Sequence, residues 1–194
     1  MKYNVLLVAL LCGFQSFAQR DFYAEGDALI LSGQFSQAEA LFREAAKTEP
    51  TNYDYVSQLG VCLLQQGKLV EAEEVLQDVL KKDATNSTAL WYIGVTQYSS
   101  KKYPQAIAAF EKVLPLLDSN SVQYPSAFWF IGKSHSAMLK TSGITSKEAD
   151  RMFQSYYEYI RLLPDAPDVA KIRNYLNAVS QNRPAQITDK WIAQ

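Results

Sequence analysis

The sequence has few of the residues that build disulfides and metal sites. Its 194 residues include two cysteines, Cys12 and Cys62, and one histidine, His135. If the start of the chain is removed on export, Cys62 is left alone and no internal disulfide can form. We expect it to be a buried, inert thiol, and the alternative is a reactive or intermolecular thiol. No zinc-ligand spacing or phosphate-binding loop occurs, so neither a metal nor a cofactor is predicted.

Long hydrophobic runs are scarce as well. The longest covers residues 5–14, whereas a membrane-spanning helix needs about 20 apolar residues. Lys2 precedes this run, and the small residues Ser16 and Ala18 follow it, which is typical of a secretory signal peptide. We therefore predict a signal peptide over residues 1–18 and no membrane span in the chain that remains after cleavage.

This leader predicts that the mature chain begins at Gln19 and is exported to the periplasm or cell envelope of a bacterium. Two alternatives stay open. The leader could remain as an uncleaved anchor, or a lipid could be attached to Cys12, although Leu11 before it is not the small residue that lipidation needs.

Charge is modest and nearly balanced, with 19 lysines and arginines against 20 aspartates and glutamates. The longest basic runs are the pairs Lys81-Lys82 and Lys101-Lys102. Because nucleic-acid binding needs a clustered basic face, no nucleic-acid partner is expected. A group of three glutamates at positions 71, 73 and 74 is interpreted as the solvated face of a helix rather than a cation site.

Repetition is the strongest feature of the chain. Glycines recur at one fixed interval, at Gly26, Gly60 and Gly94, and an alanine follows each of them at one fixed offset, at Ala38, Ala72 and Ala106. Apolar residues between these landmarks follow helical spacing. A fixed period of this length indicates a solenoid of helical hairpins, which must stack because one hairpin cannot bury both of its faces.

The repeat resembles the tetratricopeptide repeat family, whose pattern over about 34 residues is W-x2-L-G-x2-Y, then A-x3-F, then P. The matching residues are Phe22, Gly26, Leu29, Ala38, Phe42 and Pro50 in the first unit, Val56, Leu59, Gly60, Leu63, Ala72 and Leu76 in the second, and Leu90, Ile93, Gly94, Ala106 and Phe110 in the third. Glu25 and Gln97 depart from the pattern. The resemblance covers about residues 19–164 and implies an all-α, right-handed α-solenoid.

The expected domain covers residues 19–181 and consists of about four tetratricopeptide hairpins and a C-terminal capping helix. The hairpins are placed at about 19–52, 53–86, 87–118 and 125–164, the capping helix at about 167–181, and a tail at 182–194. Helices are expected over 22–31 and 35–48 in the first unit, and over 88–99 and 104–117 in the third.

The fourth unit departs from the period, because the interval from Gly132 to Ala149 is longer than the interval from Gly94 to Ala106. We place the extra residues in a loop over 140–146 and pair Ala149 with Phe153 as the A-x3-F element. An alternative register aligns Pro164 with the family's proline and moves Ala149 out of place.

In this family the first helix of each hairpin lines a concave groove. The resemblance therefore implies that partner-binding residues point inward from these helices, and we predict Tyr23, Asp27, Leu64, Trp91, Val95, Tyr98, Trp129 and Lys133. Tryptophan and tyrosine combine a large apolar area with a polar tip, so they often dominate binding energy. The alternative is that these rings pack between hairpins.

Two other kinds of site are not expected. Some family members clamp a C-terminal carboxylate with basic residues, but the corresponding positions here supply no positive charge: Tyr23, Asp27, Gln58, Thr88 and Tyr92. The run Ser134-His135-Ser136 has no acid at a sensible spacing and no strained-turn glycine motif. We predict that His135 is a packing residue and that the chain is not an enzyme.

The sequence thus predicts a non-catalytic adaptor in the cell envelope that holds a peptide or protein partner in an aromatic groove. One alternative is a structural subunit of an envelope assembly, which fills the groove with its own tail and makes its contacts through its convex face or the loop in the 140s. The other is a glycan- or peptidoglycan-binding module. Trp191 and Ile192 discriminate between these functions, because their presence in the groove would argue against an adaptor.

Overall fold

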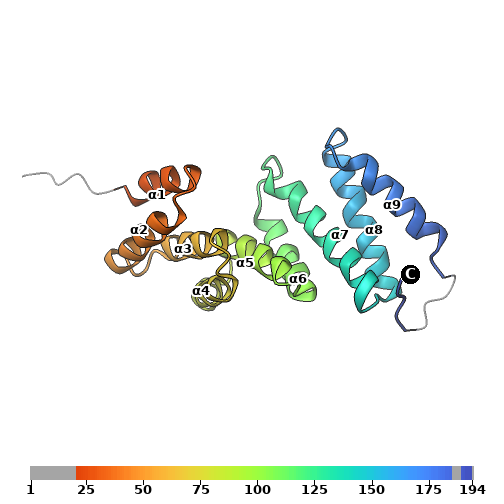
Figure 1. The fold of residues 1–194 in the computed structure, drawn as a ribbon, viewed down its shortest axis with the longest axis horizontal. Helices are drawn as coiled ribbons and strands as arrows, with labels where there is room; N and C mark the ends of the chain where they lie inside the picture. Colours follow the sequence, from red (N-terminus) through yellow and green to blue (C-terminus); the bar gives the residue numbers. More distant parts are fainter. Residues whose placement is uncertain (1–20, 185–188, 194) are drawn as a thin grey trace, which may run out of the picture.

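The computed structural model describes residues 21–184 and 189–193, so the predicted signal peptide lies outside the described residues. Within these ranges the chain is built from helices (Figure 1). In order they are α1 (Phe22–Leu31), α2 (Phe35–Thr48), α3 (Tyr53–Gln65), α4 (Leu69–Lys82), α5 (Ser87–Ser99), α6 (Tyr103–Val113), the 3-10 helix η1 (Leu114–Leu116), α7 (Gln123–Thr141), α8 (Ser146–Leu162) and α9 (Val169–Gln181).

Consecutive helices pair into four hairpins, and α9 follows the last of them, which confirms the expected α-solenoid. The first hairpin has the expected helix bounds. The third differs, because α6 ends at Val113 and continues as a 3-10 turn instead of running to residue 117. Pro115 explains this change, since it has no amide hydrogen to continue the α-helical bonding pattern.

Glycines account for the close helix crossing within each hairpin. A side-chain carbon added to Gly26 would lie 2.1 Å from the ring of Phe42, and one added to Gly60 would lie 2.6 Å from Leu76. The third hairpin repeats this contact between Gly94 and Phe110 at 2.9 Å. Because such distances leave no room for a side chain, the regular spacing of glycine follows from packing.

The fourth hairpin corrects the register that the sequence favoured. Gly132 packs against Tyr156 at 2.9 Å, not against Phe153, which is only half-buried. Tyr156 therefore takes the position that Phe110 has in the third unit, and Met152 takes the alanine position. Pairing Ala149 with Phe153 was wrong, and the alternative register based on Pro164 agrees with the structure.

The extra residues of this hairpin lengthen its helices instead of forming a long loop over 140–146. Helix α5 ends five residues after Gly94, but α7 continues for nine residues after Gly132. Helix α8 opens with a capping box in which Thr145 and Glu148 exchange hydrogen bonds. As a result α8 starts about one turn further before its packing residue Tyr156 than α6 starts before Phe110. The last hairpin is therefore about one turn longer on each side.

Residues 191–193 of the tail lie against this longer hairpin. The amide of Ile144 donates to the carbonyl of Trp191 at 2.9 Å, and the amide of Trp191 donates to the carbonyl of Ile144 at 2.8 Å. Ala193 adds a bond to Leu139 in the last turns of α7. In Figure 1, α7, α8 and α9 lie side by side at the opposite end of the molecule from α1 and α2.

Candidate functional site

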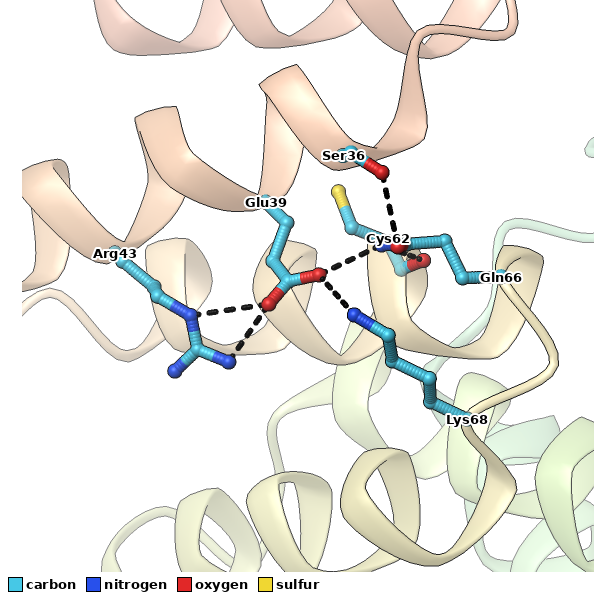
Figure 2. Close-up of polar contacts among 6 residues, drawn as sticks. All are labelled: Ser36, Glu39, Arg43, Cys62, Gln66 and Lys68. Atoms are coloured by element: carbon cyan, nitrogen blue, oxygen red, sulfur yellow. Dashed lines mark hydrogen bonds and ion pairs between the residues drawn. The ribbon is translucent and has the colours of Figure 1, made fainter.

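The charged groups between the first two hairpins are paired with one another. Figure 2 shows Glu39 between Arg43 of its own helix and two residues at the end of α3 and in the α3–α4 turn. Its carboxylate accepts hydrogen bonds from Lys68 Nζ at 2.9 Å, Gln66 Nε2 at 2.7 Å and Arg43 Nη2 at 2.8 Å. The bond from Lys68 is the main cause that lowers the pKa of Glu39 to about 2. This cluster holds two hairpins together and uses its charge within the fold.

The same arrangement recurs one repeat later. Glu73 accepts from Lys102 Nζ at 2.7 Å and from Gln97 Nε2 at 3.3 Å. Glu73 and Lys102 follow Glu39 and Lys68 by the same interval that separates Gly26 from Gly60. Part of the glutamate group expected on a solvated face is therefore buried in an inter-hairpin ion pair, since Glu73 is buried while positions 71 and 74 are exposed.

The predicted groove residues of the first two hairpins mostly take part in packing. The ring of Tyr23 lies 4.7 Å from that of Tyr55 and 6.5 Å from that of Phe42, and burial raises the pKa of its hydroxyl. Leu64 is half-buried against the same apolar cluster. Asp27 is exposed. These positions do not form a continuous aromatic surface.

Trp91 lies in the core, because only 8% of its surface is exposed. Its ring meets Phe110 at 5.3 Å and Phe130 at 6.0 Å, both edge to face. Phe130 comes from the long helix α7, which closes over this part of α5. Trp91 therefore packs between hairpins, as the alternative interpretation expected, and it is not available to a ligand. Val95, the next predicted residue of α5, is half-buried beside the same core.

The structure brings three of the predicted residues together where the end of α5 lies beside the middle of α7. The ring of Tyr98 lies 6.5 Å from that of Trp129, and Lys133 Nζ lies over the Trp129 ring at 5.3 Å. The indole Nε1 of Trp129 donates to Asp168 Oδ2 at 2.7 Å, which fixes the ring against the start of α9. Tyr98, Trp129 and Lys133 are all partly exposed.

Trp129 and Lys133 line a cleft between α7 and α9, which has a volume of about 350 Å³, and Tyr98 lies outside its lining against Trp129. We call it the α7–α9 cleft. Its lining residues are Trp129, Lys133, Ser136 and Lys140 of α7, Tyr156 of α8, and Asp168, Lys171, Ile172 and Tyr175 at and within α9. Positions 129, 133, 136 and 140 recur every three to four residues, so one face of α7 forms a wall of the cleft.

Positive charge dominates the α7–α9 cleft. Within the part of the chain that the structure describes, Lys133, Lys140 and Lys171 form no ion pair. Lys140 Nζ lies over the ring of Tyr175 at 5.6 Å, which repeats the contact of Lys133 with Trp129. The acid of the lining, Asp168, accepts from Trp129 and also from the hydroxyl of Tyr159. These bonds engage both of its carboxylate oxygens.

The floor of the cleft is polar but internally paired. The hydroxyls of Ser136 and Tyr156 lie 3.1 Å apart, and Ser136 also donates to the sulfur of Met152 at 3.4 Å. Burial raises the pKa of Tyr156 above its ordinary range, so its hydroxyl stays protonated. The partners of Ser136 among the described residues thus include Tyr156 and Met152, which hold its hydroxyl in the floor of the cleft.

Sequence reasoning missed the residues that complete this cleft: Lys140, Asp168, Lys171 and Tyr175. Lys140 belongs to the extra turn of α7, where a loop was expected. The others belong to α9 and its start, which were interpreted as a cap with no binding role. The spacing of Lys133, Ser136 and Lys140 on one helical face could have indicated the site.

His135 faces another hollow, of about 620 Å³, which is bordered by Glu111, Glu148 and Arg151. It is 4% exposed, and neither ring nitrogen has a hydrogen-bond partner among the described residues. Burial lowers its pKa, so the imidazole is neutral at neutral pH. This burial agrees with a packing role, and within the described chain the ring is not bonded to any nucleophile.

The cysteine within residues 21–184 and 189–193 is shielded from solvent. Cys62 is buried, and burial raises the pKa of its thiol to about 12, which makes the thiolate scarce at neutral pH. No group of three or more histidine, cysteine, aspartate or glutamate residues there could hold a metal ion. None of the helices in these ranges has the length and apolar character needed to cross a membrane.

Comparison with known families agrees with the repeat seen in the structure. Two family models described as tetratricopeptide repeat match the sequence, one over residues 29–93 and the other over residues 71–121. The chain is a tetratricopeptide repeat protein. Comparison with curated protein sequences gives no significant match.

Solved structures of other tetratricopeptide proteins share this fold. MamA 41-end from Desulfovibrio magneticus RS-1 has a TM-score of 0.68 at 16% identity, with 83% of this chain and 84% of that chain covered. YrrB, described as a TPR protein with an unusual peptide-binding site, has a TM-score of 0.58 at 16% identity, with coverage of 79% and 73%. At these identities the likeness concerns the fold alone.

Proposed function

We propose that this tetratricopeptide protein is an exported, non-catalytic adaptor that holds a peptide segment of a partner protein in the α7–α9 cleft. Trp129, Lys133, Lys140, Lys171 and Tyr175 line the site, and Tyr98 supports the Trp129 ring from α5. The observation that carries the proposal is the cleft itself, where aromatic rings and lysines without an ion pair among the described residues meet on a preformed surface.

The preformed shape favours binding of a flexible segment. Asp168 fixes Trp129 at 2.7 Å, and the paired hydroxyls of Ser136 and Tyr156 fix the floor. A surface that is already ordered loses little conformational entropy when a ligand binds. YrrB, which shares this fold, is described as having a peptide-binding site, and this likeness of fold supports the proposal.

The position of the tail favours an adaptor over a structural subunit that fills its own groove. Trp191, Ile192 and Ala193 line a separate hollow beside α9 and are not among the residues that line the α7–α9 cleft. Lys140 and Tyr175 border both spaces, so the described part of the tail stands next to the cleft and leaves its interior open.

Export to the envelope rests on the sequence pattern of residues 1–18. Cell fractionation and the mass of the mature protein test it, and we expect a chain that begins at Gln19. A full-length chain in the cytoplasm would contradict export while leaving the binding proposal intact.

Photocrosslinking in cells tests the binding proposal. A benzoyl-phenylalanine placed at Asn174, which is exposed on α9 one turn from Lys171, should give a discrete crosslinked product. The same group at Glu74, an exposed position on α4, serves as the matched control and should give none. Trp129→Ala should remove the product at Asn174. Equal products at both positions, or none at Asn174, would contradict an adaptor that uses this cleft.

A further inference from the structure

We infer that the segment held in the α7–α9 cleft is acidic and extended, with carboxylates about three residues apart. This inference rests on the proposed function and names the chemistry of the partner. It starts from the charges of the cleft, where three lysines lack an ion pair among the described residues and the acid of the lining is already bonded to Trp129 and Tyr159.

The charge distribution along the chain concentrates attraction at this cleft. Residues 21–118 contain eight lysines and arginines against fourteen aspartates and glutamates, while residues 119–194 contain nine against six. An acidic segment is therefore repelled by the first three hairpins and attracted by the last one. Such complementarity fixes where and in which orientation a partner docks, and it also accelerates the encounter.

The spacing of the lysines indicates the spacing of the acids. Lys133 and Lys140 are seven residues apart on one face of α7, which corresponds to about 10 Å along the helix axis. An extended segment in the polyproline II conformation rises about 3.1 Å per residue and returns to the same side every third residue, or about 9 Å. Carboxylates at positions i and i+3 thus match the two ammonium groups, and Lys171 faces them from α9.

The aromatic rings beneath the two lysines of α7 indicate which type of residue lies between the two acidic residues of the bound segment. Trp129 and Tyr175 hold the ammonium groups of Lys133 and Lys140 at 5.3 and 5.6 Å through cation–π contacts. These contacts keep the charges at the surface of the cleft, and Ile172 adds apolar area between them. We therefore expect an apolar residue between the acidic ones.

Display of random twelve-residue peptides on phage tests this inference against the purified mature chain. Peptides enriched on the wild type should contain more aspartate and glutamate than the starting library, with pairs at i and i+3. The variant Lys133→Gln/Lys140→Gln/Lys171→Gln should lose this excess, and a peptide selected on the wild type should bind it roughly tenfold more weakly, because each exposed ion pair contributes modestly.

A second triple variant, Lys47→Gln/Lys112→Gln/Arg173→Gln, removes the same charge from exposed positions outside the cleft. It should keep both the enrichment and the affinity of the wild type. Equal losses in the two variants would overturn the inference, since they would show general charge attraction only.

The remaining outcomes separate this inference from the proposed function. Enrichment without acidic residues, lost in Trp129→Ala, would refute the acidic partner but support a peptide-binding cleft. No enrichment on any variant would contradict both. If sedimentation at low salt instead shows self-association that the cleft variant abolishes, the occupant is the acidic first part of a second copy, and the inference of a separate partner is wrong.

Discussion

The first and last hairpins of this molecule use charged residues in opposite ways. At the junction of the first two hairpins, Glu39 is surrounded by Lys68, Arg43 and Gln66, and its charge is used within the fold (Figure 2). In the last hairpin, Lys133 and Lys140 lie over the faces of aromatic rings and form no ion pair within the described chain. The first arrangement stabilises the solenoid, and the second leaves positive charge available to a ligand.

This difference follows the regularity of the repeat. The ion pair between Glu39 and Lys68 recurs at the equivalent positions of the next repeat as Glu73 and Lys102, where the hairpins follow the regular period. The last hairpin is longer: its extra turn of α7 carries Lys140, and Leu139 of α7 and Ile144 of the following loop bond the tail. A departure from the repeat therefore creates a surface that the regular part of the chain does not have.

The largest expected effect distinguishes core tryptophan from cleft tryptophan. Trp91→Ala should lower the free energy of unfolding by about 3–5 kcal/mol, because it leaves a cavity beside Phe110 and Phe130. Urea denaturation followed by circular dichroism measures this change. Trp129→Ala should cost clearly less, since its ring is partly exposed, but it should abolish the crosslink at Asn174. Similar losses of stability in both variants would remove the distinction between core and cleft.

Much of this architecture could be predicted from the sequence because it repeats. The landmarks at Gly26, Gly60 and Gly94 each reflect a close contact that only glycine permits, so the pattern and the packing have one cause. The bounds of α1 and α2 follow from the same regularity, with Gly33 at φ +74° in the turn between them.

The fourth unit could not be predicted in the same way, because the family pattern has no fixed place for its additional residues. Ala149 and Phe153 imitate the A-x3-F element in sequence, while Met152 and Tyr156 form it in space. Trp129 and Lys133 could be predicted because they follow the regular pattern of the first helix of a hairpin. Lys140 in the extra turn of α7 and the cleft residues of α9 were missed because they lie beyond that pattern. Trp91 was assigned to the groove because it lies on the first helix of its hairpin, but in the structure Phe130 of α7 packs against its ring.

A smaller effect tests whether charge in the first hairpins is structural. Glu39→Gln should lower the free energy of unfolding by about 1–3 kcal/mol at pH 7, because Lys68 loses its partner at a site where the glutamate side chain is 13% exposed. The folded pKa of Glu39 is lowered to about 2, so its contribution is present above the ordinary pKa of about 4.5 and is lost as pH falls toward 2. The difference between wild type and variant in urea denaturation should therefore shrink between pH 7 and pH 3.

Glu74→Gln is the matched control for this measurement. Glu74 is exposed on α4, and the same substitution there should change stability by less than about 0.5 kcal/mol at either pH. If Glu39→Gln behaves like Glu74→Gln, the ion pairs between the first hairpins contribute nothing to stability, and the contrast with the last hairpin fails.

The smallest expected effect concerns the lysines of the α7–α9 cleft. The variant Lys133→Gln/Lys140→Gln/Lys171→Gln should change the free energy of unfolding by less than about 1 kcal/mol in total, because these side chains lack ion pairs among the described residues and their cation–π contacts are exposed and weak. Removing three neighbouring positive charges also relieves their mutual repulsion, which offsets part of the lost contacts. Urea denaturation at low and high salt measures both contributions: the wild type should gain stability relative to the variant as salt screens the repulsion. A loss comparable to that of Glu39→Gln would mean that the lysines support the fold, and their availability to an acidic partner would then have no basis.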